Sequence, residues 1–281
     1  MKLRRSWHSV ARSFGSAFVI EMISPKISGV TALESVKNLT PAQFVHTSFY
    51  IYSTIKSMLS YEGCVPLGKS LLNIMDDILK NPVIGTNTCL GYGLVALSLA
   101  STILYSLRAN ECDSIEECVL RGYDEFKYCL TNESTGDLVK SIELASPSYH
   151  GQYYSPKLLS NVFELLLESS IWDLVAYNIV NKFSITLDLY NFAKSATVGE
   201  LLRYTSELYR YAASKYFDSI SFKSGGIMLS RLVQEVASKY TPSSYEARDV
   251  LVNKVGVNLG SISDLVASSI ALVLLRVEWG L

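Results

Sequence analysis

The fold is decided by the stretch GTNTCLGYGLVALSLASTILYSL, which runs from Gly85 to Leu107 and contains no charged residue. It begins with a small polar turn in which Thr86, Asn87 and Thr88 are residue types that cap helix N-termini. The remainder is apolar. The first amides of a helix have no intrahelical partner, and the helix dipole adds partial positive charge there. The stretch therefore predicts a helix whose N-terminus binds phosphate.

The apolar part of this stretch has two interpretations. Cys89 to Leu107 is 19 residues long, close to the roughly 20 apolar residues that a membrane span requires. Small and polar residues dilute it, however, and it is the only segment of its kind. A helix that is apolar nearly all round is expected in the middle of a large helical protein. We predict a buried central helix.

The overall composition excludes several classes of function. The 281 residues are 49% hydrophobic, with a mean hydropathy of +0.22, which indicates a globular chain with a large core. A net charge of −1, from 25 basic and 26 acidic residues, gives no electrostatic basis for binding nucleic acid or an anionic membrane. Any anionic ligand must therefore be bound by a local site.

The cysteines and the N-terminus predict a cytoplasmic protein. The cysteines are odd in number and include no C-x-x-C pair, so they indicate neither a disulfide framework nor a zinc site. They are Cys64, Cys89, Cys112, Cys118 and Cys129. Three scattered histidines do not supply a metal site either. Residues 1–12 lack the continuous apolar core of a signal peptide.

Apolar residues from Trp7 to Phe18 recur every three or four positions, which predicts a helix. Glu21 continues the apolar face of that helix, where a carboxylate is costly unless it is paired or used. The helix should end near Ser24, because Pro25 disfavours helix in the residue before it. Two interpretations of Glu21 stay open: a structural one, as a buried ion pair or a helix end turned to solvent, and a functional one.

The segment Gly63–Ser70 fits the Walker A pattern, in which loop amides and a lysine cradle phosphates. This pattern has meaning only between a strand and a helix. Residues 50–61 instead have helical periodicity, and the chain shows no β/α alternation that would build a parallel sheet. We therefore interpret Gly63–Gly68 as a helix–helix connection, with Lys69 among the first residues of the next helix.

A second nearly uncharged helix is predicted at Leu265–Leu275, after a turn that contains Asn258 and Gly260. Ser261 and Asp264 have the spacing of a capping box, which is the structural explanation for Asp264. The chain then has two apolar helices that each follow a polar turn. Their N-termini, if brought together, would make a site for a polyphosphate.

The other segments also have helical periodicity. Leu158–Phe183 is expected as one long or broken helix, and Ser148–Pro156 as the longest irregular stretch. No repeat, low-complexity tract or linker divides the chain. We predict an all-α protein, in which residues 1–281 form a single compact domain of about ten helices around two central apolar helices.

Four motifs occur in the order seen in one known family. They are Glu21-x-x-x-Pro25-Lys26, Gly85-Thr86-Asn87-Thr88-x-x-Gly91, Leu144-Ala145-Ser146-Pro147 and Asn258-x-Gly260-x-x-x-Asp264. In these motifs the chain resembles the triphosphoribosyl-dephospho-CoA synthase family, most of all its archaeal members, over almost its whole length. The Gly-Thr-Asn-Thr motif is the most specific of the four.

The resemblance implies an all-α enzyme that moves the triphosphoribosyl group of ATP to the ribose 2′-hydroxyl of dephospho-CoA, or of a related acceptor, and releases adenine. ATP is then a substrate, with Mg²⁺ as its expected companion. The implied partners are small molecules, a nucleotide and a dephospho-CoA-like acceptor. The alternative is a diverged, non-catalytic member that serves as a nucleotide-binding or protein-interaction module.

This chemistry assigns roles to the motif residues. Loss of adenine develops positive charge on the sugar, which a nearby carboxylate stabilises, and a general base for the acceptor hydroxyl adds roughly 10²- to 10⁴-fold. Glu21 and Asp264 are the candidate catalytic residues. A triphosphate needs helix amides and a cation, and the candidate binding residues are Lys26, Gly85, Thr86, Asn87, Thr88, Asn258 and Gly260.

One helix departs from the family pattern. Where the family has an acid and, five residues later, an Arg-Lys pair, this chain has Trp172, Tyr177 and Asn178. Asp173 stands one position after the acid, and nothing in the sequence replaces the basic pair. Loss of positive charge favours the non-catalytic alternative, whereas the retained Gly-Thr-Asn-Thr motif favours the enzyme.

Overall fold

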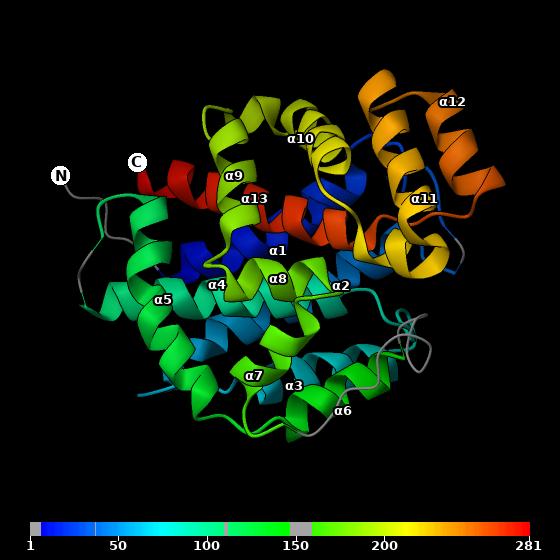
Figure 1. Cartoon of the computed structure of the whole chain (residues 1–281). Helices are drawn as coiled ribbons and strands as arrows, with labels where there is room; N and C mark the ends of the chain where they lie inside the picture. The colour runs from blue at the N-terminus through cyan, green and yellow to red at the C-terminus, as the bar shows by residue number, and fades with distance from the viewer. Residues whose placement is uncertain (1–6, 37, 110–111, 147–158) are drawn as a thin grey trace.

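The computed structural model describes residues 7–36, 38–109, 112–146 and 159–281 (Figure 1). Within these ranges the chain is mainly helical, and the bridged pair Val36 and Leu39 is isolated rather than part of a strand. The all-α prediction is confirmed. The helices found there are α1 (Trp7–Ile23), α2 (Pro41–Ser57), α3 (Leu67–Lys80), α4 (Leu90–Ala109), α5 (Ile115–Thr131), α6 (Gly136–Ala145), α7 (Val162–Ser169), α8 (Leu174–Val180), α9 (Ser184–Ala193), α10 (Leu201–Lys215), α11 (Ser219–Lys239), α12 (Tyr245–Arg248) and α13 (Gly260–Trp279), with short helical turns η1 (Met58–Ser60), η2 (Val198–Glu200) and η3 (Asp249–Lys254).

The described residues form thirteen α-helices, against about ten expected. The interval Leu158–Phe183 holds two of them, α7 and α8, separated by a short connection. α11 contains a kink with non-helical backbone angles at Gly225 and Gly226. The irregular stretch expected at Ser148–Pro156 lies outside the described residues.

Two helices that are apolar on all sides form the centre of the molecule, as predicted. α4 and α13 pack against each other, and α1 packs on both; Figure 1 shows α13 and α1 crossing the middle of the fold near α4. By length and composition α4 and α13 could each cross a membrane, so two segments rather than one meet that criterion. Their most apolar windows are 78% and 67% buried within the fold, as expected for core helices.

The other helices surround this centre. α2 packs on α1, α5 packs on α4, and α3 pairs with α6. α9 and α10 pack on α13, and α11 packs on α10. In Figure 1, α10, α11 and α12 lie at the top, and α3, α6 and α7 lie at the bottom. The described helices enclose one main hydrophobic cluster, to which nearly all of them contribute.

Local sequence signals set the N-terminal end of α2 and the C-terminal end of α1. Pro41 occupies the first position of α2, and Thr40 and Gln43 form a capping box there. α1 ends at Ile23, as the following Pro25 predicts. The chain therefore leaves α1 in a turn that returns over the end of the helix.

The Walker-like segment is a helix–helix connection, as interpreted from the sequence. The residues before Gly63 are helical, in α2 and η1. At the N-terminus of α3, the Glu133 carboxylate lies where a phosphate would bind in a Walker A loop. It accepts hydrogen bonds from the amides of Leu67 (3.0 Å) and Gly68 (2.7 Å). A Cβ at Gly68 would lie 2.8 Å from the backbone nitrogen of Leu138. The glycine therefore allows α6 to pack closely on α3.

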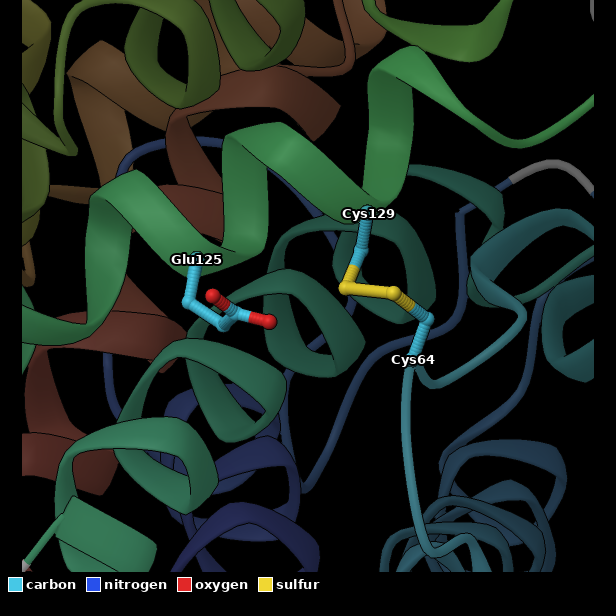
Figure 2. A group of neighbouring side chains, drawn as sticks. All are labelled: Cys64, Glu125 and Cys129. Carbon is cyan, nitrogen blue, oxygen red and sulfur yellow. A yellow bond between two sulfur atoms is a disulfide. The ribbon is translucent and has the colours of Figure 1, made fainter.

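The prediction from the cysteines was wrong. Cys64 is bonded to Cys129, Cys112 is bonded to Cys118, and Cys89 is a buried thiol. The first bond joins positions 65 residues apart whose Cα atoms lie 5.4 Å apart in the fold. The odd count of cysteines concealed these pairs, since one thiol stays free. The first disulfide ties the start of the Walker-like connection to α5 (Figure 2).

Figure 2 also shows Glu125 beside the Cys64–Cys129 bond. Ligand atoms of these three residues lie within 4.8 Å of one another. The sulfurs are bonded to each other, whereas a metal ion needs thiolates, so this group is not a metal site. Disulfides are rare in cytosolic proteins, those of hyperthermophiles being the exception, and the cytoplasmic location stays a prediction.

Candidate functional site

A cavity of about 420 Å³ opens where the C-terminal end of α1 meets the N-termini of α4 and α13. The expected meeting of these two N-termini is therefore present. One part of the cavity is polar and contains the candidate residues Glu21, Lys26, Thr86, Asn87, Thr88, Asn258, Gly260 and Asp264. The lining also has apolar residues, which include Leu71, Leu94, Leu138, Ile142, Leu165 and Leu166. Gly85 is the candidate that lies outside the lining.

Glu21 and Lys26 form a buried ion pair at the end of α1. The turn after the helix brings Lys26 Nζ to 2.5 Å from Glu21 Oε1 and 3.1 Å from the Glu21 carbonyl oxygen. Each side chain is only 3% exposed. Burial lowers the pKa of the Lys26 ammonium, and the Glu21 carboxylate opposes that change. Glu21 is thus a buried ion-pair partner and also a wall of the cavity.

Asp264 reaches from α13 to the N-terminus of α4. A Cβ at Gly91 would lie 2.0 Å from Asp264 Oδ2, so this glycine leaves the space that the carboxyl occupies. The backbone amide of Tyr92 hydrogen-bonds to the carboxyl and favours its ionised form. Burial and then the charge of Glu21 act more strongly and raise the pKa of Asp264 well above its ordinary value. Asp264 therefore keeps its proton to a higher pH than an ordinary aspartate does.

The capping box expected from Ser261 and Asp264 is not formed. α13 begins at Gly260, so Ser261 lies inside its first turn, and the residue before Gly260 makes no side-chain cap. The cap comes from Asp218, whose Oδ2 accepts the amide of Ile262 at 3.1 Å. The structural explanation for Asp264 therefore fails, because another carboxylate caps α13.

The N-terminus of α4 is capped by a residue of its own turn. Asn87 Oδ1 accepts hydrogen bonds from the amides of Cys89 (3.3 Å) and Leu90 (3.0 Å). The next turn of the helix offers the amide of Tyr92 to Asp264. These amides, which the sequence suggested for phosphate, have partners within the chain.

The rest of the turn before α4 is held in place by the backbone conformation of Gly85 and by a hydrogen bond to α2. Gly85 has a φ of +56°, a conformation that glycine adopts without steric cost. Thr88 Oγ1 lies 2.6 Å from Thr47 Oγ1 of α2 in a buried hydrogen bond. Gly85 and Thr88 thus fix the path of the chain, while Thr86 lies at the cavity between them.

The turn after α1 lies against the turn before α13. Ser28 Oγ donates a hydrogen bond of 2.7 Å to the Val257 carbonyl. Gly29 has a φ of +91°, and a Cβ there would lie 3.4 Å from Lys26 Cε and 3.7 Å from Asn258 Oδ1. Gly29 therefore lies next to both Lys26 and Asn258 at the cavity.

The sequence profile of the ATP:dephospho-CoA triphosphoribosyl transferase family matches residues 7–281. The chain belongs to this family. Membership confirms the resemblance seen in the four motifs and makes the chain a transferase, as expected from them. No curated protein matches the chain.

Among solved structures, the fold is similar to that of a putative triphosphoribosyl-dephospho-CoA synthase from Archaeoglobus fulgidus. The TM-score is 0.60 at 20% sequence identity, over 82% of this chain and 97% of the other. This likeness supports the fold, and the family match supports the transferase function.

The third motif of the transferase family ends α6 at the cavity. Ser146 has a φ of +39° and terminates the helix in the left-handed region. Ala145 and Ser146 both line the cavity. Pro147, the last residue of the motif, lies outside the described residues.

Lys223 gives the cavity a positive charge that the sequence did not reveal. Its side chain is 4% exposed, and its Nζ lies 3.0 Å from Asp173 Oδ2. Both residues line the cavity, whereas Tyr177 and Asn178 do not. The expected loss of positive charge is therefore offset from another helix, α11. One lysine shortly before the kink at Gly225–Gly226 gave no recognisable sequence signal.

Proposed function

We propose that this cavity is where the triphosphoribosyl group of ATP is transferred to the 2′-hydroxyl of dephospho-CoA or a closely related acceptor. The observation that carries the proposal is a pair of carboxyls in different environments. Glu21 is ion-paired with Lys26, whereas Asp264 has a pKa raised well above its ordinary value. Carboxyls whose environments differ in this way suit the roles of acid and base.

The reaction breaks the bond between C1′ and the adenine nitrogen of ATP, and the electron pair leaves with adenine. Asp264 donates its proton to the leaving adenine. Glu21 stabilises the positive charge that develops on the ribose and accepts the proton of the acceptor hydroxyl, whose oxygen bonds to C1′. The charge of Glu21 raises the pKa of Asp264, so a single proton shared by the two carboxyls is favoured before and after transfer.

The triphosphate is proposed to lie against Lys26, Thr86 and Asn258. Lys26 is a buried cation at the cavity wall, and Thr86 and Asn258 are polar side chains of the two turns that meet there. Because Asn87 already accepts two of the first amides of α4, the phosphates contact side chains rather than these amides. Asn87, together with Gly85, Thr88 and Gly260, shapes the turns.

Mg²⁺ is proposed to enter with ATP. Asp173, Glu21 and Asp264 offer oxygen donors, which Mg²⁺ prefers, and the charges of Glu21 and Asp173 both raise the pKa of Asp264. With the proton on Asp264, Lys26 and Lys223 balance Glu21 and Asp173 in the cavity lining, so it is the triphosphate that adds the negative charge a cation would relieve. Asp173 is the residue that would hold the ion, which would neutralise charge on the phosphates.

The test is the release of adenine, followed by chromatography, when the chain is mixed with ATP, Mg²⁺ and dephospho-CoA. Glu21→Gln and Asp264→Asn should each lower kcat by roughly 10²- to 10⁴-fold. Asp76→Asn is a matched control, because Asp76 is exposed on α3 and paired with Lys80. A folded wild-type chain that binds ATP without releasing adenine would contradict the proposal, as would full rates in both variants.

A further inference from the structure

Trp172, Asp173 and Leu174, which lead from the connection after α7 into α8, are held by one face of α11. The Trp172 ring stacks on Phe222, with centroids 6.4 Å apart and planes inclined by 27°. Asp173 pairs with Lys223, and the amide of Leu174 donates to Ser219 Oγ at 2.6 Å. An aromatic side chain and a cation are therefore placed next to each other by the same two segments.

Trp172 is unusual among the tryptophans of this chain. It lines the cavity and is 54% exposed, whereas Trp7 and Trp279 are 7% and 4% exposed in the core. Phe222 supports its ring from one side. An indole held in this way presents a large apolar surface to the cavity, and a flat aromatic ring is the group that covers such a surface best.

Lys223 supplies the second half of the arrangement. It is buried, lines the same cavity, and is paired there with Asp173. Asp173 also accepts the amides of Val175 and Ala176 at the start of α8, so it stays in place if Lys223 turns to another anion. A phosphate of a ligand would offer Lys223 a second, more highly charged partner.

We propose that Trp172 and Lys223 form a subsite for an adenine nucleotide, in which the base stacks on Trp172 and a phosphate binds Lys223. This inference rests on the proposed function, since both substrates of that reaction carry adenine and phosphate. The base belongs to ATP or to dephospho-CoA, and separate titrations distinguish the two.

The primary measurement is tryptophan fluorescence of the full chain during titration. Because the other two tryptophans are buried in the core, quenching by a base stacked on the indole should come from Trp172. ATP or dephospho-CoA should quench the emission, and inorganic triphosphate should not. The compound that quenches at the lower concentration identifies the source of the base. Trp172→Phe should abolish the quenching, and quenching that persists in this variant would overturn the proposal.

Calorimetric titration separates stacking from other contacts. Trp172→Phe keeps an aromatic face and should bind within a few-fold of wild type, whereas Trp172→Ala should bind roughly 5- to 150-fold more weakly. Tyr128→Ala is the matched control, because Tyr128 is exposed on α5 and does not line the cavity. Wild-type affinity in Trp172→Ala would overturn the stacking role.

The phosphate contact is tested with Lys223→Gln. This variant should bind the nucleotide that quenches Trp172, ATP or dephospho-CoA, at least tenfold more weakly, but should bind adenosine, which has no phosphate, as wild type does. Asp173→Asn/Lys223→Gln removes both charges and tests the same contact without leaving the half-buried Asp173 carboxylate unpaired. Lys80→Gln, at an exposed ion pair on α3, is the control. Equal losses for that nucleotide and for adenosine would overturn the phosphate contact.

The adenine-release assay separates this subsite from the proposed reaction. If the wild-type chain releases adenine while Trp172→Ala binds both nucleotides normally, the subsite is wrong and the transfer stands. If adenine compounds quench Trp172 and Trp172→Ala loses binding, but no adenine is released, the subsite stands and the proposed transfer fails.

Discussion

The N-termini of α3 and α4 have different uses. Each follows a turn that contains glycine, and each receives a carboxyl group from a distant part of the chain: Glu133 at α3 and Asp264 at α4. Glu133 accepts two amides and closes a junction between helices. Asp264 lines the cavity, and its carboxyl lies among other acidic groups.

The difference shows what a helix N-terminus does and does not predict. Both ends attract an anion, as the helix dipole requires. The sequence of the turn does not tell whether that anion belongs to a ligand or to the chain itself. At both ends the chain supplies a carboxyl group of its own, and only the carboxyl at α4 also faces a space large enough for a substrate.

The largest expected difference is in the effects of removing the two carboxylates. Asp264→Asn should lose roughly 10²- to 10⁴-fold in kcat and should gain stability. In the wild-type protein the folded-state pKa of Asp264 is raised, so the native state binds more protons than the unfolded state. The stability of the wild-type protein therefore falls as the pH rises from about 4 through the folded-state pKa. Asparagine does not ionise and removes that loss. Urea unfolding from acidic to neutral pH measures the gain, which should grow with pH.

Glu133→Gln is the counterpart at α3. Glutamine has one acceptor oxygen, so one of the two amides now bonded to Glu133 would face an NH₂ group, at a cost of about 1–3 kcal/mol. The rate of adenine release per folded molecule should stay at the wild-type value. A large loss of kcat in Glu133→Gln, or a loss of stability in Asp264→Asn, would remove the contrast between the two ends.

The next largest expected effect is the loss of stability when the disulfide that ties the Walker-like connection to α5 is removed. Loss of the Cys64–Cys129 bond, whose cysteines are 65 residues apart, should cost about 4 kcal/mol by the chain-entropy estimate. Cys118→Ser opens a much shorter loop, with a separation of 6 residues, and should cost about 2 kcal/mol. Cys64→Ser should leave kcat unchanged, because Cys64 does not line the cavity. Denaturant midpoints and adenine release measure the two effects, and equal midpoints would contradict the expected order.

Glycine substitutions should separate the two ends again. Gly91→Ala would press a Cβ against Asp264 Oδ2 and displace a side chain that can move, so kcat should fall by about 10²-fold with little change in stability. Gly68→Ala would press against the backbone of Leu138, which cannot move alone, so stability should fall by about 1–3 kcal/mol. A stability loss in Gly91→Ala as large as that in Gly68→Ala would make both glycines packing residues.

Much of this fold follows from local sequence pattern. The uncharged segments gave the two central helices, Pro25 gave the end of α1, and the absence of a preceding strand removed the Walker A interpretation. Periodicity was sufficient because a buried helix face is a local property of the sequence. The disulfides were missed because pairing depends on how distant segments approach, which an odd number of cysteines does not reveal.

The candidate site was predictable where a motif placed its residues, and not where the tertiary structure did. Glu21, Asp264 and the turn residues except Gly85 meet at one cavity. The capping role assigned to Asp264 belongs instead to Asp218, because the cap comes from another helix. Lys223 reaches the cavity through the packing of α11 on the connection before α8, and a single lysine in a helix carries no spacing signal.

The smallest expected effect concerns Asn87, which caps α4 and also lines the cavity. Asn87→Ala would remove the acceptor for two amides and should cost about 0.5–2 kcal/mol of stability. Asn87→Asp keeps the cap and should keep the stability, but it adds a negative charge where the triphosphate is proposed to lie, so ATP should bind more weakly. Ser114→Ala removes a cap from α5 and should lower stability without changing ATP affinity. If Asn87→Asp binds ATP normally, the phosphates do not approach the start of α4, and this end of α4 would resemble that of α3 in serving the chain alone.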